Sequence, residues 1–263
     1  MRRGVIVLGM TPRPYILDEV TWKTVKDTRY DVAVLPWGAT EAHNYHLPYT
    51  TDNIATEKIA ALAAGYAWER GAKVVVLPAV PFGVNTGQLD IPLCINMNPS
   101  TQSLVLRDVA ASLAGQGIKK LVVMNGHGGN DFRQMIRELQ GAMALFVCTV
   151  NWYQAVDLKP FFSDLGDHAG EMETSVLMYL TPELVRPLAE AGPGRARGFK
   201  IGALREKWAW APRLWRKVTD DTGVGNPAAA TAEKGKKYVE ALTAKIGTFL
   251  VDLAKADPEA MYE

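Results

Sequence analysis

Short apolar runs alternate along the chain with longer amphipathic stretches. The runs are rich in β-branched residues and predict buried strands at Val5–Leu8, Val32–Leu35, Val74–Leu77, Leu121–Met124 and Phe146–Val150. Between them, apolar residues recur every three or four positions, which predicts helices at Asn53–Glu69, Thr101–Gln116, Asp131–Met143 and Ala228–Lys255. This alternation is typical of an α/β fold with a mainly parallel β-sheet and helices on both faces.

The composition is that of one globular domain spanning residues 1–263. Of the 263 residues, 48% are hydrophobic and 22% are charged, which is enough for a single large core. The helix and strand pattern breaks down at 185–227, where Gly, Pro and Trp accumulate. We expect this irregular segment to form a lid or a subunit contact. The net charge of +1 predicts no general attraction to nucleic acid or to membranes.

The ends and the cysteines of the chain indicate a cytoplasmic protein. Prolines at positions 12 and 14 interrupt the apolar start too early for a signal peptide or a membrane span. The two cysteines, Cys94 and Cys148, have neither metal-binding nor redox spacing. We therefore expect two buried free thiols in a reducing compartment.

All four histidines lie in polar, glycine-rich or acid-rich segments that follow a predicted strand or begin a helix; they are His43, His46, His127 and His168. A lone histidine usually has a structural role. Four histidines beside carboxylates indicate a metal site instead, because neutral imidazole and carboxylate are the ligands that borderline and hard divalent ions require. Parallel sheets bind ligands at the carboxyl ends of their strands, where these segments are expected.

The first candidate ligands follow the strand that begins at Val32. Glu41 and His43 are two residues apart, so in extended backbone they point the same way. Asp52 lies just before a predicted helix, where it is either a ligand or the N-cap of that helix.

Two further segments complete the candidate site. The glycines of Asn-Gly-His-Gly-Gly-Asn at 125–130 allow a tight turn that brings His127 toward the other ligands. His168 and Glu171 are three residues apart and would share one face of a helix that opens there. Glu173 would point elsewhere, so this spacing favours Glu171 as a ligand.

At these residues the chain resembles the creatininase (creatinine amidohydrolase) family. The matching motifs are Pro-x-Gly-x-Thr-Glu-x-His with a following His-Leu-Pro and Asp at 36–52, Asn-Gly-His-Gly-Gly-Asn at 125–130, and His-Ala-Gly-Glu-x-Glu-Thr-Ser at 168–175, with a weaker match at 223–235. The resemblance spans about residues 20–250 and implies a three-layer α/β/α fold. It also implies a homo-oligomer, a hexamer in this family.

The resemblance implies two divalent metal ions per chain, and the mixed nitrogen and oxygen ligands suit Zn, Mn or Fe. In creatininase itself a glutamate two residues after the histidine of Asn-Gly-His completes the second metal, whereas this chain has Gly129 there. We expect Glu171 to supply the missing carboxylate. The ligands that the resemblance implies are Glu41, Asp52 and His127 for one ion, and His43 with a bridging Asp52 for the other.

The remaining roles also come from the resemblance. His168 with Asp167 is expected to act in acid–base catalysis, beside a hydroxide that the metals generate from water. Trp152 matches a tryptophan of the creatininase active site and is the candidate substrate contact. His46 and Glu173 are expected to orient the metal ligands.

The expected function is that of a dinuclear amidohydrolase that cleaves a non-peptide C–N bond in a small molecule, a cyclic amide or a formamide. Within the family, a formamidopyrimidine-type deformylase and a peptide-maturing hydrolase are alternatives, because the Gly129 and Glu171 exchange looks more like these than like creatininase. An inactive homologue that keeps the metal site as a binding or structural protein is an alternative of another class.

The segment Arg195–Lys217 carries eight basic residues, one acid and three tryptophans. We expect it to form a lid or to face a neighbouring subunit. Basic residues interleaved with aromatic ones also occur in proteins that bind single-stranded nucleic acid, and the same charges suit an anionic group of a substrate. The near-neutral remainder of the chain favours the lid.

Overall fold

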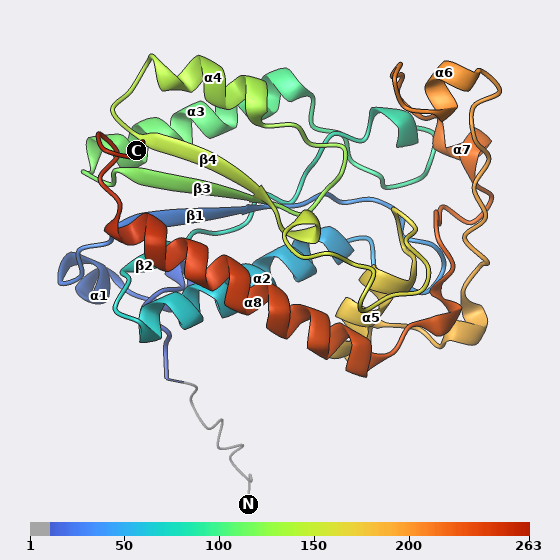
Figure 1. Cartoon of the computed structure of the whole chain (residues 1–263), viewed down its shortest axis with the longest axis horizontal. Coiled ribbons are helices and arrows are strands. Elements are labelled where there is room, and N and C mark those ends of the chain that lie inside the picture. The colour runs from blue at the N-terminus through green and yellow to red at the C-terminus, as the bar shows by residue number, and fades with distance from the viewer. Residues whose placement is uncertain (1–10) are drawn as a thin grey trace, which may run out of the picture.

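A four-stranded parallel β-sheet runs through the computed structural model, which describes residues 11–263 (Figure 1). The strands lie in the order β2-β1-β3-β4. Their bounds are Val32–Trp37 for β1, Val74–Val76 for β2, Lys120–Asn125 for β3 and Phe146–Asn151 for β4. Each of these strands coincides with a predicted apolar run. The fifth predicted strand, Val5–Leu8, lies outside the described residues.

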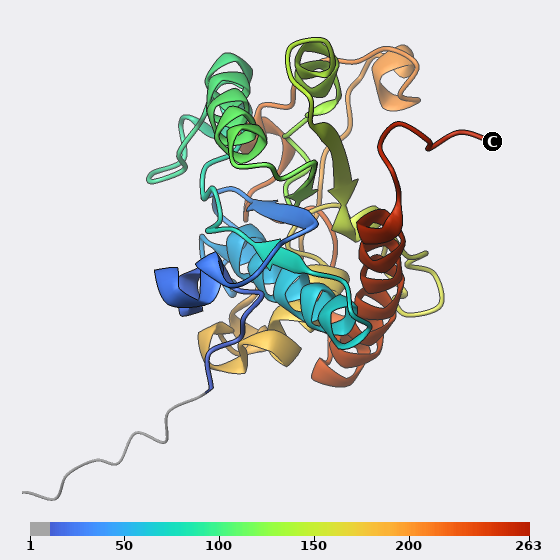
Figure 2. The same ribbon diagram turned by 90° about the vertical axis from the view of Figure 1, so that its left-hand side faces the viewer.

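Helices cover both faces of the sheet, as Figure 2 shows. On one face lie α2 (Thr51–Glu69) and α8 (Ala232–Lys255), with α5 (Glu171–Leu180) packed against both; on the other lie α3 (Pro99–Gly115) and α4 (Arg133–Gln140). A short helix, α1 (Trp22–Lys26), precedes the first strand. The predicted α/β class, a parallel sheet between two helical layers, is therefore confirmed.

Alternate residues of each strand enter two separate cores. Val32 and Val34 of β1 belong to the core shared with α2 and α8, whereas Ala33 and Leu35 belong to the core shared with α3 and α4. The cause is that successive side chains of a strand point to opposite faces of the sheet. Because both faces are covered, all residues of β1 and β3 are buried, which explains why these runs show no polar alternation.

The order of the strands marks one place at the edge of the sheet. The chain passes from β1 through α2 to β2 in one direction, and from β3 through α4 to β4 in the other. The carboxyl ends of β1 and β3 therefore form a switch point, where loops leave neighbouring strands in opposite directions. Such points hold the ligand sites of open parallel sheets.

Helix α5 begins later than the sequence analysis expected. Ala169 has a positive φ of 51°, and Gly170 precedes the first helical residue, Glu171, with extended backbone. His168 therefore lies before the helix rather than on it, and the expected helical spacing between His168 and Glu171 does not apply.

Helix α8 also begins late, at Ala232 instead of Ala228. Pro227–Ala229 forms a separate 3-10 turn, and the side chain of Thr231 then accepts a hydrogen bond from the backbone N–H of Lys234. Near this end α8 lies very close to α5, since a Cβ added at Gly235 would collide with the carbonyl oxygen of Ser175. The missing side chain at Gly235 thus sets how near α5 approaches α8.

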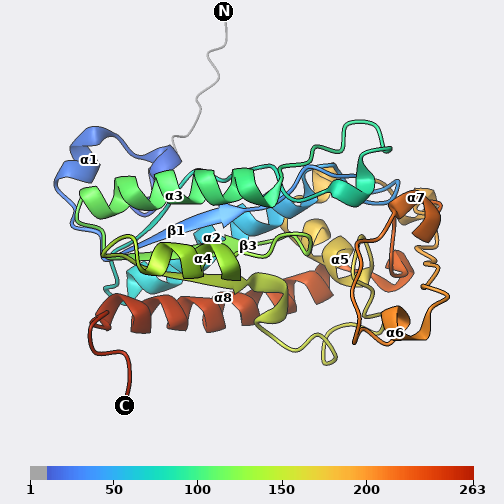
Figure 3. The ribbon, with the colours of Figure 1, turned by 90° about the horizontal axis from the view of Figure 1, so that it is seen from above.

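Residues 185–227 contain only short helical turns, among them α6 (Gly202–Arg205) and α7 (Trp215–Val218). Figure 3 shows this segment beside α5, at one end of the molecule. That end is the one at which the site described below is built. No helix in residues 11–263 is both long enough and apolar enough to cross a membrane.

Replacement of Leu242 tests the packing of α8 against the sheet. Leu242 is fully buried in the core shared with α2, so Leu242→Ala should lower the free energy of unfolding by about 2–5 kcal/mol, through lost transfer energy and a residual cavity. Urea unfolding followed by circular dichroism measures this. Lys245→Ala, at an exposed position of the same helix, should change stability by less than about 0.5 kcal/mol. Equal effects of the two substitutions would refute this packing.

Candidate metal centre

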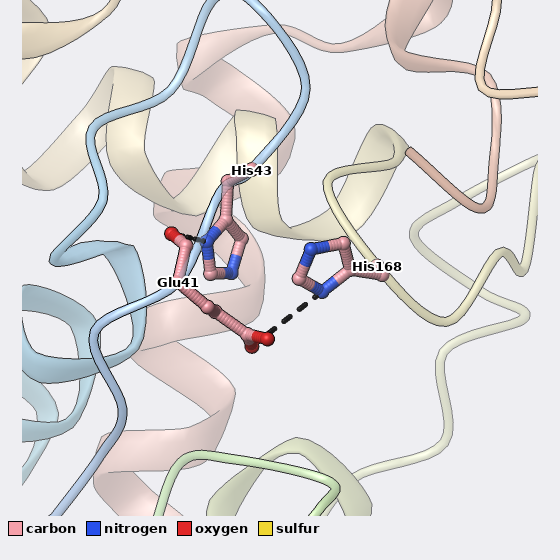
Figure 4. Close-up of side chains that lie close together, drawn as sticks. All are labelled: Glu41, His43 and His168. Carbon is pink, nitrogen blue, oxygen red and sulfur yellow. Dashed lines mark hydrogen bonds and ion pairs between the residues drawn. The ribbon is translucent and has the colours of Figure 1, made fainter. Parts of the chain in front are cut away.

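Carboxylate and imidazole side chains converge at the switch point of the sheet. Glu41 and His43 follow β1, Asp52 lies in the first turn of α2, and His127 follows β3. His168, just before α5, and Glu173, in the first turn of α5, are two more. The donor atoms form three overlapping groups, each within 4.8 Å: Glu41, Asp52 and His127; His43, Asp52 and Glu173; and Glu41, His43 and His168. Figure 4 shows the last of these.

Asp52 joins two of the groups. Its Oδ2 lies 3.0 Å from Nδ1 of His127, which is also 2.9 Å from Oε1 of Glu41. Its Oδ1 lies 3.1 Å from Nε2 of His43, which in turn is 4.0 Å from Oε2 of Glu173. Asp52 therefore belongs to two neighbouring groups of candidate ligands, and as the second residue of α2 it does not cap that helix.

Each imidazole is tied to the backbone through its other ring nitrogen. Nδ1 of His43 donates to the carbonyl of Glu41 at 3.1 Å, drawn as a dashed line in Figure 4. Nε2 of His127 is 3.0 Å from the carbonyl of Val84, and Nε2 of His168 is 2.8 Å from that of Ala42. These carbonyls fix the neutral tautomers. The lone pair of each ring then faces the carboxylates.

This arrangement fits divalent cations. A lone pair that faces a carboxylate oxygen is repelled unless a positive charge lies between them. Oδ2 of Asp52 is buried and, among residues 11–263, accepts no hydrogen bond of good geometry. Nitrogen and oxygen donors in this mixture are the ligands that Zn and Mn take in proteins. The residues present therefore match the chemistry of a metal centre.

The shifted pKa values of the cluster also indicate a site that attracts positive charge. Burial alone would lower the pKa of His43, but the carboxylates of Asp52 and Glu173 raise it to about 10. Burial likewise opposes protonation of His127, whose pKa is nevertheless raised well above 6.5 by Glu41 and Asp52. Burial raises the pKa of the Glu173 carboxyl. The carboxylates thus draw positive charge into a buried site, which protons or metal ions can supply.

The structure places Glu171 outside the cluster, against the expectation from helical spacing. Its Oε2 accepts hydrogen bonds from the backbone N–H groups of Ser163 and Asp164, at 2.8 and 2.7 Å, and from the Ser163 hydroxyl. Its Oε1 lies 2.5 Å from Nζ of Lys234. Both oxygens are engaged in holding a loop and α8. Glu173 takes the position that Glu171 was expected to occupy.

No carboxylate can come from position 129. A Cβ added at Gly129 would collide with the carbonyl of Val84 and with Nε2 of His127. The hydrogen bond that anchors His127 therefore requires a glycine there. A carboxylate for the group with His43 and Asp52 must come from another segment, and α5 supplies it through Glu173.

Three other expected site residues make different contacts from those predicted. The Asp167 carboxylate binds Arg213 at 3.0 Å instead of the His168 ring. The Trp152 side chain is 1% exposed and donates to Thr56 Oγ1 at 3.0 Å, so it is a core residue and does not line the cavity. His46 is buried beside Thr174, with 2.8 Å between Nε2 and Oγ1, and so contacts the residue that follows Glu173.

A cavity of about 1310 Å³ opens onto the cluster. Its wall includes residues that sequence reasoning missed. Tyr153, next to the expected Trp152, lines it, as do Arg213 and Trp215 from the irregular segment. Gln88 lines it too and donates to Oε2 of Glu41. The Trp-Tyr pair after β4 could have pointed to Tyr153, but no local pattern marks Gln88.

Comparison with known sequences identifies relatives over most of the chain. The family profile described as creatininase, creatinine amidohydrolase, matches residues 18–250. A mycofactocin precursor peptide peptidase of Mycolicibacterium smegmatis is 31% identical over 224 residues, which cover 78% of this chain and 78% of the peptidase.

Solved structures share the fold. A Bacteroides fragilis protein assigned as a creatinine amidohydrolase has a TM-score of 0.91 at 46% identity, over 97% of this chain and 100% of that chain. A manganese form of creatininase has a TM-score of 0.74 at 22% identity, over 92% of this chain and 99% of that chain. A mutant creatininase of Zn-Zn type, covered to the same extent, gives 0.73 at 23%.

A His46→Gln variant tests the neutral state of the buried imidazole beside the cluster. Burial lowers the pKa of His46 to about 4, whereas an unfolded histidine titrates near about 6.5. The unfolded chain therefore takes up a proton that the folded chain does not, and the stability that His46 gives at neutral pH is lost as the pH falls from about 6.5 toward 4.

Between pH 7 and pH 5, the difference in unfolding free energy between wild type and His46→Gln should shift by about 2 kcal/mol against the wild type. Urea titrations at the two pH values measure it. A difference that is independent of pH would contradict the depressed pKa.

Proposed function

Because the chain belongs to the creatininase family of hydrolases, we propose that it cleaves an amide C–N bond with two divalent cations held at the buried cluster. The observation that carries this proposal is the set of imidazoles anchored to carbonyls and turned toward carboxylates. One cation fits among Glu41, Asp52 and His127, and the other among His43, Asp52 and Glu173. Zinc and manganese suit these donors, and creatininase structures of Zn and Mn type support the choice.

Cations bound in this way would supply an activated water and polarise the amide carbonyl. The proton that the leaving nitrogen needs is assigned to His168. Its Nε2 donates to the carbonyl of Ala42, so Nδ1 is the atom that would accept the proton lost by the attacking water and pass it to the leaving nitrogen. Tilted packing against the rings of His43 and Trp215, whose centroids lie 4.2 and 4.9 Å away, limits the movement of the His168 ring.

Tyr153 is the candidate donor to the carbonyl oxygen of the substrate. It lines the cavity, and burial raises the pKa of its phenol to about 12. The hydroxyl therefore keeps its proton at neutral pH. A fixed donor of this kind stabilises the negative charge that develops on a carbonyl oxygen during amide cleavage.

A small amide, cyclic or a formamide, is the substrate class that the family profile favours. A second candidate is the end of a precursor peptide. The cavity of about 1310 Å³ exceeds the roughly 300–1,000 Å³ typical of small-molecule pockets, and the relative from Mycolicibacterium smegmatis is named a peptidase. Both candidates place the reacting amide at the same cluster.

The predicted homo-oligomer, a hexamer, and the cytoplasmic location stay predictions. Exposed apolar side chains, including Trp208 and Trp210 of the irregular segment and Leu93, suit the predicted contacts between subunits.

A substrate screen tests the proposed reaction. Zinc- or manganese-loaded protein should hydrolyse one member of a panel of creatinine, formamidopyrimidines, small lactams and short peptides, with products identified by mass spectrometry. Removal of the metal by a chelator should abolish turnover, and returning the ion should restore it. Cleavage of a peptide alone would select the second candidate. Fully loaded protein that cleaves no amide in the panel would refute the assignment.

The two glutamates of α5 separate a metal-binding role from a structural one. Glu173→Gln should reduce the metal content from two ions per chain to about one, because a neutral amide is a poor ligand at that position. Glu171→Gln should retain both ions and lower the free energy of unfolding by about 1–3 kcal/mol, through weakened hydrogen bonds to the loop and Lys234.

Elemental analysis of both purified variants, with urea unfolding, distinguishes these outcomes. Loss of an ion from Glu171→Gln, with two ions retained in Glu173→Gln, would restore the assignment from helical spacing and overturn the one from the structure.

A further inference from the structure

Arg213 is the single lysine or arginine side chain on the described wall of the cavity. Apart from the residues assigned to the cations, the charged side chains there are the carboxylates of Asp131, Glu138 and Asp167. These carboxylates would repel the part of a negatively charged substrate that lies outside the cluster. Outside the cluster, the guanidinium of Arg213 is therefore the place on the described wall where an anionic group gains an attractive partner.

The guanidinium is held at a defined position relative to the cluster. It lies over the ring of Trp215, with 4.6 Å from Cζ to the ring centroid. The Trp215 ring, in a residue only 9% exposed, packs at a tilt against His168, and His168 packs at a tilt against His43. A single indole thus lies between Arg213 and His168, so one substrate can contact both Arg213 and the cluster.

Part of the guanidinium remains available to a ligand. Within residues 11–263 its hydrogen bonds come from Nη1 alone, which donates to both oxygens of Asp167 at 3.2 and 3.0 Å. The two side chains are 39% and 55% exposed, and ion pairs this exposed contribute little stability. Nε and Nη2 can form the paired hydrogen bonds with which arginine recognises carboxylate and phosphate.

We propose that Arg213 determines specificity by binding an anionic group, a carboxylate or a phosphate, that the amide substrate carries a few bonds from the reacting C–N bond. This assignment rests on the proposed amide hydrolysis at the cluster. Asp167 holds the guanidinium through Nη1 and shares it with the substrate. The irregular segment thereby adds a positively charged side chain to the cavity wall.

Three matched probes test the proposal by calorimetry on metal-loaded protein. N-acetylglycine carries a carboxylate next to an amide, N-acetylglycinamide is its neutral counterpart, and acetamidomethylphosphonate carries the doubly charged group. The wild type should bind at least one anionic probe about 10- to 100-fold more tightly than the neutral one, the range expected for a charge-assisted pair. The anion with the larger preference identifies the source of the charge.

Substitutions assign the preference to Arg213. Arg213→Gln should abolish it, and Arg213→Lys should keep the charge but lose most of the paired recognition. Arg216→Gln is the matched control, because Arg216 lies on the same segment but outside the cavity wall, paired with Asp90. It should keep the full preference. Asp167→Asn should increase the preference, since it removes the competing carboxylate.

Two results would overturn the proposal: a wild type with no preference for either anion, which includes one that binds neither measurably, or a preference that survives in Arg213→Gln with the metal content unchanged. The latter would mean that the cations at the cluster bind the anion directly. If no amide is cleaved in the screen but the anion preference depends on Arg213, only the proposed reaction is refuted. If an amide is cleaved but the anion preference does not depend on Arg213, only the specificity assignment is refuted.

Discussion

The hydrogen bonds from three histidine rings to backbone carbonyls are the interactions on which the site depends. Val84, Ala42 and Glu41 supply these carbonyls from loops at the carboxyl ends of the strands. The loops are fixed by a sheet that is buried on both faces, so the orientation of each ring follows from the fold. The second nitrogen of each ring then faces the carboxylates, and positive charge from a proton or a metal ion makes this arrangement stable.

The sequence was sufficient for the fold and for most of the residues that converge at the cluster. The strands were recognisable because both of their faces are buried, and the motifs around Glu41 and His127 follow strands whose ends meet at the switch point. The prediction that His168 and Glu171 share one face of a helix was wrong, because Ala169 adopts a positive φ and the helix begins only at Glu171. An alanine in the sequence does not predict a positive φ. The choice between Glu171 and Glu173 therefore required the structure.

Other parts of the site were hidden by distance along the chain. Arg213 meets Asp167 across 46 positions and Gln88 reaches Glu41 across 47, and neither pair belongs to a local pattern. Trp152 and Tyr153 are neighbours in sequence, but the turn after β4 buries the first against Thr56 and leaves the second in the cavity. Periodicity identifies the faces of helices and strands, whereas contacts between loops depend on how the whole fold closes.

Because α8 lies so close to α5, the geometry of the site also depends on Gly235, a residue outside the site. Gly235 packs on the carbonyl of Ser175, two residues beyond Glu173. A larger residue there would displace α5 together with the Glu173 carboxylate. The other residues of the cluster would stay in place, because their loops are fixed by the sheet. The position of Glu173 therefore depends on a glycine at position 235. Sequence variation in this protein should be restricted at a helix position that a map of the active site alone would leave free to drift.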